Sequence, residues 1–255
     1  MSSAPESTPP VASSPHFATP RWSVVCAAGA SAEPATRRGA LETLCRAYWR
    51  PLYAYARRRG LRAAEAEDLV QGFFARLLEK NELAVAAPER GRFRSFLLAA
   101  LAHYLANERD RAAAHKRGGG RELLSLDAAE GGLGALEARS DESPEQIYER
   151  AWALSVLERA NERLRAEQTR IGRERVHERL LPALAGEAQA LPYRELAVEL
   201  GLSENAVKVA VHRLRKRLGE LVRDEVLQTL DDARELEDEL VRLHAALAGP
   251  ETESS

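Results

Sequence analysis

The stretch from Leu191 to Val222 reads LPYRELAVELGLSENAVKVAVHRLRKRLGELV, and it decides how the fold of this chain is interpreted. Its spacing predicts two helices joined by a tight turn. Pro192 suits the first position of the first helix, and Gly201 suits the left-handed residue that ends it. Ser203 is a residue type that often caps a helix, so we expect the second helix to begin directly after it.

The second helix of this stretch divides into an apolar face and a polar, basic face. The apolar side chains recur at helical spacing and are Val207, Ala210, Val211, Leu214 and Leu218. The other face carries Asn205, Lys208, His212, Arg215 and Lys216. A helix-turn-helix uses such a division, because one face holds the helix pair together while the other enters a major groove. The simpler alternative is an amphipathic helix with a solvated basic side.

The composition indicates a helical protein of one or two domains. The 255 residues are 45% hydrophobic and only 5% aromatic, so the cores must rely on Leu, Ala and Val. The formal net charge of −2 predicts weak DNA binding by the free chain, since few phosphates would be neutralised. Basic residues nevertheless gather at 57–62, 109–121 and 208–217, and local fields matter more than the total at contact range.

Several kinds of site and location have no signature in the sequence. It contains no nucleotide-binding or zinc-protease motif, and we expect no catalytic residue, no metal and no cofactor. Cys26 and Cys45 lack metal-site spacing with any histidine, and we interpret both as buried free thiols. No apolar run is long enough for a membrane span and no secretory signal begins the chain, so we expect a cytoplasmic protein without a membrane partner.

Helical patterns recur along the chain. Segments 41–60, 63–80 and 92–117 each carry an apolar stripe, which predicts a helical bundle. Further helices are expected at 147–164 and at 227–247, the last one acidic and amphipathic, whereas 165–186 shows no clear pattern. The predicted order is a disordered tail at 1–19, a helical bundle at 20–117, a flexible acidic linker at 118–144, a helix-turn-helix domain at 145–226, an acidic helix at 227–248 and a tail at 249–255. The predicted fold class is all-α, with two helical domains joined by the flexible linker.

Three segments together carry a resemblance to a known family. They are AEAEDLVQGFFARLLEK at 64–80, GRFRSFLLAALAHYLANERDRAAAHKR at 91–117 and YRELAVELGLSENAVKVAVHRLRKRL at 193–218. In this order and spacing, the chain resembles bacterial RNA polymerase sigma factors of the extracytoplasmic-function type, with their region 2 and region 4 domains. The resemblance implies a factor that binds core RNA polymerase at its clamp and flap and directs initiation from specific promoter DNA. An anti-sigma factor or a regulatory kinase would be a further partner of such a factor.

The resemblance also implies which residues touch the polymerase. Segment 64–80 would dock on the clamp, and its candidate contacts are Asp68, Leu69, Gln71, Phe73 and Phe74. Phe73 and Phe74 have the alternative of packing inward as core residues. The sequence departs from the family pattern at Gly72, where a Glu commonly follows the Gln, and this change removes a charge and lowers helix propensity.

Two sets of residues would contact DNA if the resemblance holds. Region 2 would read and melt the −10 element with Arg92, Arg94, His103, Asn107, Arg109 and Arg111. Small alanines between these residues suit an unstacked strand, although His103 and Asn107 stand where the family often carries Asn and Asp. Region 4 would read the −35 element with Ser203, Asn205, Lys208, His212, Arg215 and Lys216. We assign Asn205, Lys208 and His212 to bases, and Arg215 and Lys216 to phosphates.

Other readings of the sequence remain open at this point. A stand-alone helix-turn-helix regulator would normally dimerise and bind a palindrome unaided. A helical enzyme using Glu65 and Asp68 would need a facing acid–histidine set, and none surrounds them at the usual spacing. The acidic helix at 227–248 either shields region 4 in the free protein or packs its leucines on it.

Overall fold

The computed structural model describes residues 34–79, 92–116, 142–186, 191–230 and 232–248. This part of the chain consists of helices and short connections without a strand, which confirms the predicted all-α class. The predicted tails, Cys26 and the linker up to residue 141 lie outside the described residues.

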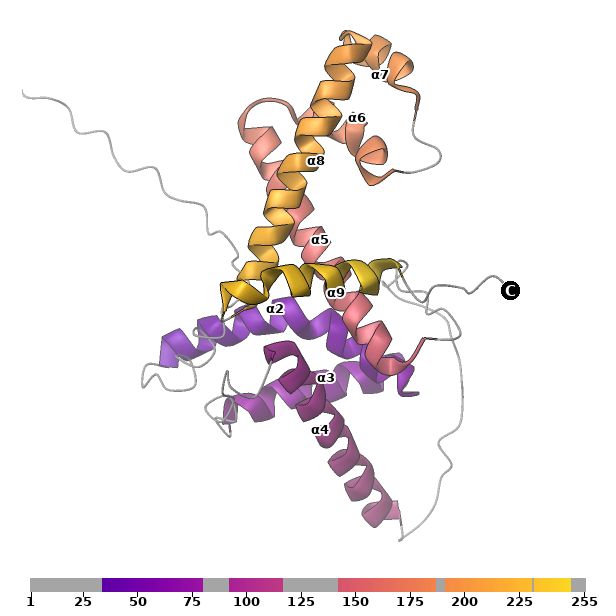
Figure 1. Cartoon of the computed structure of the whole chain (residues 1–255). Coiled ribbons are helices and arrows are strands. Elements are labelled where there is room, and N and C mark those ends of the chain that lie inside the picture. Colours follow the sequence, from indigo (N-terminus) through magenta and orange to yellow (C-terminus); the bar gives the residue numbers. More distant parts are fainter. Residues whose placement is uncertain (1–33, 80–91, 117–141, 187–190, 231, 249–255) are drawn as a thin grey trace, which may run out of the picture.

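The first three helices of the described chain form the base of the molecule (Figure 1). They are α2 (Pro34–Arg58), α3 (Ala63–Glu79) and α4 (Phe93–Lys116). Each buries the apolar stripe that the sequence predicts, and the largest fully buried side chains here are Tyr48, Leu52, Tyr55, Phe73, Leu77, Leu97 and Leu101. Cys45 packs half-buried against this N-terminal core, and burial is the main cause that raises its pKa to about 11.

Two long helices run between this base and the upper end of the molecule (Figure 1). The first is α5 (Pro144–Arg170), which starts with a capping box between Ser143 and Gln146. Its first half places Tyr148 and Trp152 in the N-terminal core, and its second half places Leu164 in the upper core. The sequence predicted that residues 145–226 belong to the second domain. In the structure, the first half of α5 belongs to the N-terminal core instead.

The second long helix, α8 (Glu204–Leu227), crosses α5 and shares the same two cores. Val207 and Val211 lie in the upper core, whereas Val226 lies in the N-terminal core. Two shorter helices complete the upper core, namely α6 (Glu174–Ala185) and α7 (Tyr193–Leu200).

The last helix is shorter than the sequence indicates. We predicted a helix from residue 227, but α8 ends there and the chain turns, passes through a short 3-10 segment at 233–235 and forms α9 (Leu236–Ala248). The turn is favoured because Leu230 is buried in the N-terminal core and the Asp232 side chain caps the segment that follows. The apolar stripe of α9 packs on the N-terminal core, with Leu243 buried there, so it does not follow the alternative in which its leucines pack on region 4.

Candidate nucleic-acid interface

The upper end of the molecule contains the predicted helix-turn-helix. Gly201 ends α7 in the left-handed conformation with φ of 64°, which a residue without Cβ adopts at no steric cost. The Leu202 N–H donates to the carbonyl of Ala197 at 2.9 Å, and Ser203 Oγ accepts from the Ala206 N–H at 3.1 Å. The turn and the cap are therefore those that the sequence predicts.

The polar face of α8 points to solvent, as its pattern indicates. Exposed residues on this face are Ser203, Asn205, Lys208, His212, Arg215 and Lys216. Lys208 pairs with Glu204 one turn earlier at 2.7 Å, and its ammonium lowers the pKa of that carboxyl. Arg215 donates to the Ala183 carbonyl of α6 at 2.5 Å, so its guanidinium is held at the edge of the face.

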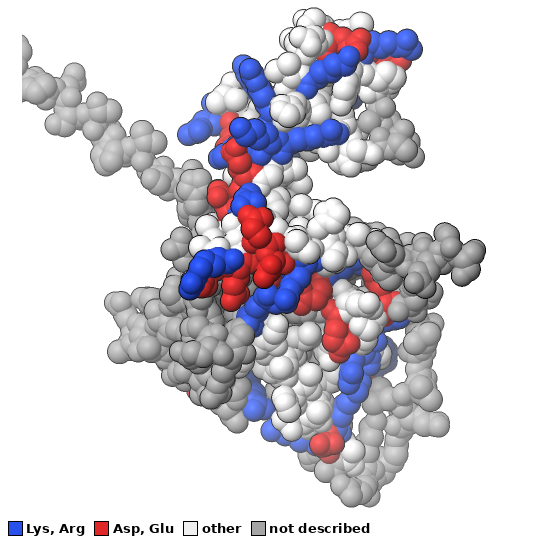
Figure 2. Space-filling view, in the orientation of Figure 1, with Lys and Arg blue, Asp and Glu red and all other residues white. Residues whose placement is uncertain are grey.

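Charge is distributed unevenly over the visible surface. Figure 2 shows mainly Lys and Arg over the upper end, and Asp and Glu gathered lower down, where α8 meets α9. The exposed basic residues of the upper end include Arg213 on α8 and Arg194 on α7, which were not among the predicted contacts. Arg213 lies inside the basic run at 208–217, and that run was the signal that could have identified it.

A second polar surface lies along α4 in the base. His103 and Asn107 are exposed on its outer side, where the neighbouring Ala99 and Ala106 leave the helix surface low. Arg109 is exposed and donates to the Arg59 carbonyl at 2.9 Å. Arg111 pairs with Glu108 at 2.5 Å. The outer side of α4 thus offers polar groups between small residues, which suits the approach of a flat base or a strand.

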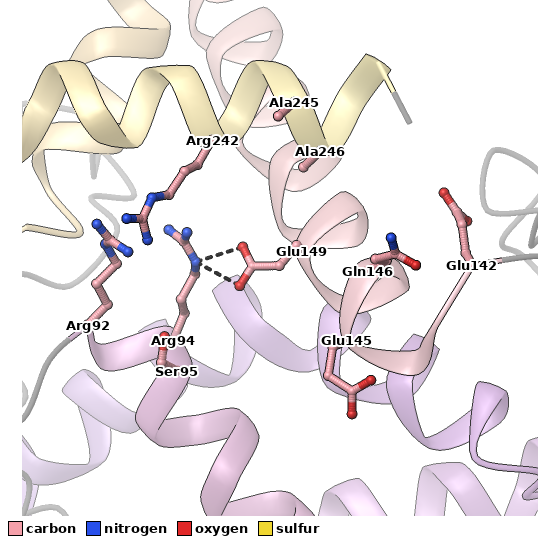
Figure 3. A pocket seen from close by; sticks show the side chains of 10 residues that line it. All are labelled: Arg92, Arg94, Ser95, Glu142, Glu145, Gln146, Glu149, Arg242, Ala245 and Ala246. Atoms are coloured by element: carbon pink, nitrogen blue, oxygen red, sulfur yellow. Dashed lines mark hydrogen bonds and ion pairs between the residues drawn. The ribbon is translucent and has the colours of Figure 1, made fainter. Parts of the chain in front are cut away.

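Arg92 and Arg94, at the start of α4, are covered by α9 and α5. The Arg94 side chain is only 5% exposed, and its Nε lies 2.8 Å from the Glu149 carboxylate. It also pairs with Glu239 of α9 and lies over the Trp152 ring, 4.1 Å from its centroid. Arg92 Nε lies 2.8 Å from Glu239. Both arginines border a cleft of about 460 Å³ between α4, α5 and α9 (Figure 3).

The predicted polymerase-docking residues of α3 separate into two groups. Asp68 and Gln71 are exposed, whereas Leu69, Phe73 and Phe74 are buried in the N-terminal core. The Phe74 ring stacks on that of Trp49, with centroids 6.3 Å apart. The buried three residues therefore position the helix, and the two polar residues face outward.

Two family models match this chain. The model described as Sigma-70 region 2 matches residues 44–115, and the model described as Sigma-70, region 4 matches residues 187–218. The chain is a sigma factor of the sigma-70 family. The pairing of these two regions agrees with the resemblance to the extracytoplasmic-function type. No curated protein and no solved structure matches the chain significantly.

The matches fall on the two polar surfaces described above. Region 2 of this sigma factor comprises most of α2 together with α3 and α4, and region 4 comprises α7 and the first part of α8. Sigma-70 proteins bind core RNA polymerase and DNA and act in promoter-specific transcription initiation, and they are not an enzyme family. Helix α9 lies beyond both matches.

The glycine that departs from the family pattern has a structural reason. A Cβ on Gly72 would lie 2.7 Å from the hydroxyl oxygen of Tyr104, which reaches across from α4 to α3. The Tyr104 ring also contacts Phe73, at a centroid distance of 5.9 Å, and the Arg76 guanidinium. Gly72 therefore makes room for the side chain that joins the two helices of region 2.

Two kinds of feature are absent from the described part of this sigma factor. None of its helices there is long and apolar enough to cross a membrane. Within the same residues, no group of three or more His, Cys, Asp or Glu side chains is placed to hold a metal ion.

Proposed function

We propose that this sigma factor reads the −10 element with α4 and the −35 element with the start of α8. The observation that supports this most strongly is the exposure of the predicted polar faces on both helices, each opposite a buried stripe. On α4, His103 and Asn107 contact the unpaired strand from a surface lowered by alanines. Arg109 and Arg111 at the end of that helix hold its phosphates.

On α8, the residues nearest the helix start contact base edges. Asn205, Lys208 and His212 follow one another along the exposed face, and the start of a recognition helix meets bases in this type of motif. Ser203 caps the helix and stands at the rim of this face. Arg215 and Lys216 lie further along, where side chains meet the phosphates, and the bond of Arg215 to α6 fixes its direction.

We propose further that Asp68 and Gln71 are the residues of α3 that touch the polymerase clamp. Both are exposed, and the core holds the helix through Leu69, Phe73 and Phe74. Asp68→Ala with Gln71→Ala should therefore weaken binding to core polymerase without loss of thermal stability. Glu162→Ala, an exposed carboxylate on α5, is the matched control. Equal affinity of all three proteins for core polymerase would contradict this assignment.

The DNA assignments are tested by transcription with core polymerase from a library of upstream sequences. Lys208→Ala and His212→Ala should each relax selection at positions in the −35 element, with losses of about 1–3 kcal/mol for a base contact. Asn107→Ala should change selection in the −10 element alone. Arg175→Ala, an exposed cation on α6, is the control. The proposal fails if the selected sequences of the variants match those of the unchanged protein.

The stand-alone regulator is separated from this proposal by the purified chain alone. A net charge of −2 gives the free protein little general affinity for phosphate. We therefore expect specific promoter binding only together with core polymerase. Tight and specific binding to a palindrome by the chain without polymerase would favour the regulator.

A further inference from the structure

Glu239 is one of the most deeply buried charged residues in the described chain. Its side chain is 1% exposed and lies on the packed side of α9, together with the buried Leu243, whereas Glu237, Asp238 and Val241 of the same helix are exposed. A carboxylate loses its hydration when it is buried, so it needs strong compensation from cations. Both of its partners, Arg92 and Arg94, come from the start of α4.

Three arginines meet at this place, beside the carboxylates of Glu142, Glu145 and Glu149 that line the same cleft. Figure 3 shows the Arg242 side chain of α9 directed toward those of Arg92 and Arg94, and the first turn of α4 contains no acid. Glu149 of α5 pairs with Arg94 from the other side. Glu239 thus provides an anionic group that contacts two arginines at the start of a helix, where backbone N–H groups also favour negative charge.

We propose that α9 is an internal cover of region 2, in which the Glu239 carboxylate occupies the place of a phosphate of the promoter strand. This inference rests on the proposed function of α4 in reading the −10 element, and it extends that function to Arg92 and Arg94, for which the resemblance implies a DNA contact. When region 2 engages DNA, α9 leaves and a backbone phosphate takes over the two guanidinium groups. DNA and α9 therefore compete for one surface, and the cover weakens binding by the free chain beyond what its net charge does.

The departure of α9 also withdraws Leu243 from the N-terminal core, so DNA binding has to outweigh that lost burial, whereas the ion pair itself opposes the exchange only weakly. Desolvation of a buried ion pair cancels much of its Coulomb attraction, so the pair adds little net stability. When the Glu239 carboxylate departs, a phosphate takes its place beside Arg92 and Arg94. The two guanidinium groups therefore keep an anionic partner throughout the exchange. Helix α8 ends at Leu227, and a short 3-10 segment at 233–235 precedes α9, so among the described residues no long helix would have to break.

The direct test is Glu239→Gln in the full chain, with Asp238→Asn as the matched control on the same helix. Glutamine keeps the shape of the side chain but removes its charge, so α9 holds Arg92 less strongly. We expect the Glu239→Gln holoenzyme to bind a fragment with an unpaired −10 strand on the order of tenfold more tightly. The control, which changes an exposed residue, should leave that affinity unchanged. Affinity of Glu239→Gln equal to that of the control overturns the cover.

Hydrogen exchange of the unchanged protein gives a second measurement, which remains valid even if the Glu239→Gln variant does not fold. Amides of residues 236–248 should be protected in the free chain and lose protection in the holoenzyme–promoter complex. Protection that persists in this complex would also overturn the cover. A failure of the proposed function has a different signature, because selection would then be unaffected by Lys208→Ala and Asn107→Ala, whatever α9 does.

Discussion

Gly72 shows how one residue of region 2 depends on its partner across a helix interface. Glycine normally costs a helix interior about 1 kcal/mol relative to alanine, so Gly72→Ala would be expected to stabilise an isolated helix. Here the added Cβ would lie 2.7 Å from the Tyr104 hydroxyl. We therefore expect Gly72→Ala to leave stability unchanged or lower it in chemical denaturation.

Two further variants make this prediction decisive. Gly219→Ala on α8 meets nothing within 4 Å of its Cβ, so it should stabilise by about 1 kcal/mol. Tyr104→Phe removes the hydroxyl and should allow Gly72→Ala to become stabilising. A gain from Gly72→Ala equal to that from Gly219→Ala would show that Tyr104 imposes no constraint.

His177 gives the upper core a dependence on pH. Burial lowers its pKa below the ordinary value, the Arg165 charge adds to this, and Glu178 and Glu174 oppose it. The unfolded chain therefore binds a proton more readily than the folded one, and this contribution to stability is present above about pH 6.5 and is lost as the pH falls through the folded pKa. His177→Leu should flatten the stability profile below about pH 6.5. An unchanged pH profile in His177→Leu would contradict this prediction.

Residue-level predictions from sequence succeed where a local pattern decides exposure. The two faces of α8 follow from helical spacing alone, and all the polar residues assigned to one face are exposed. The burial of Arg94 has another origin, because α9 and α5, distant in sequence, cover it. No spacing near Arg94 indicates that contact, so sequence reasoning placed it with the exposed candidates.

At the scale of the element, Ser203 combines a cap with a place on the candidate DNA surface. Ser203→Ala should destabilise by about 1 kcal/mol, because the Ala206 N–H loses its acceptor. Ser203→Asp should keep the cap and the stability, yet weaken promoter binding through repulsion of phosphate. Thermal denaturation and transcription with core polymerase measure the two effects separately. Loss of stability in both variants would mean that the hydroxyl does more than cap.

The long helices that were predicted from the sequence have longer apolar stripes than the helix that was not predicted. The helices at 63–79 and 93–116 were found within one residue of their ends, whereas α2 begins seven residues before the predicted segment and α5 ends six residues after it. The short helix α6 was missed, because it buries only His177, Leu180 and Ala183 and contains Pro182. The end of α8 at Leu227 was missed as well, since no glycine or proline marks it and the burial of Leu230 favours the turn.

At the scale of the molecule, α5 and α8 join two cores that the sequence suggested were separate. Glu225 of α8 is buried and pairs with two arginines of α5, Arg159 at 3.0 Å and Arg163 at 2.9 Å. We therefore expect one cooperative unfolding transition for both cores in calorimetry. Glu225→Ala should lower its midpoint, because two partly buried arginines lose their shared partner. Two resolved transitions in the unchanged protein would contradict this prediction.

The shared helices could not be inferred from sequence, because α5 changes the partners of its buried face along its length. Tyr148 and Leu164 belong to one continuous helical pattern, yet they lie in different cores. Helical periodicity predicts that both residues are buried, but it does not predict which other helices they pack against. The flexible linker of the predicted architecture falls at 118–141, outside the described residues.

Because α5 and α8 contribute to both cores, the family boundaries are not suitable limits for expressing one region alone. A piece that stops at residue 115, where the region 2 match ends, would lack Trp152, Val226 and Leu243, which the remaining helices surround. Its bared apolar side chains would drive self-association at working concentrations. Expression of region 2 alone, cut at its family boundary, would thus yield an insoluble fragment.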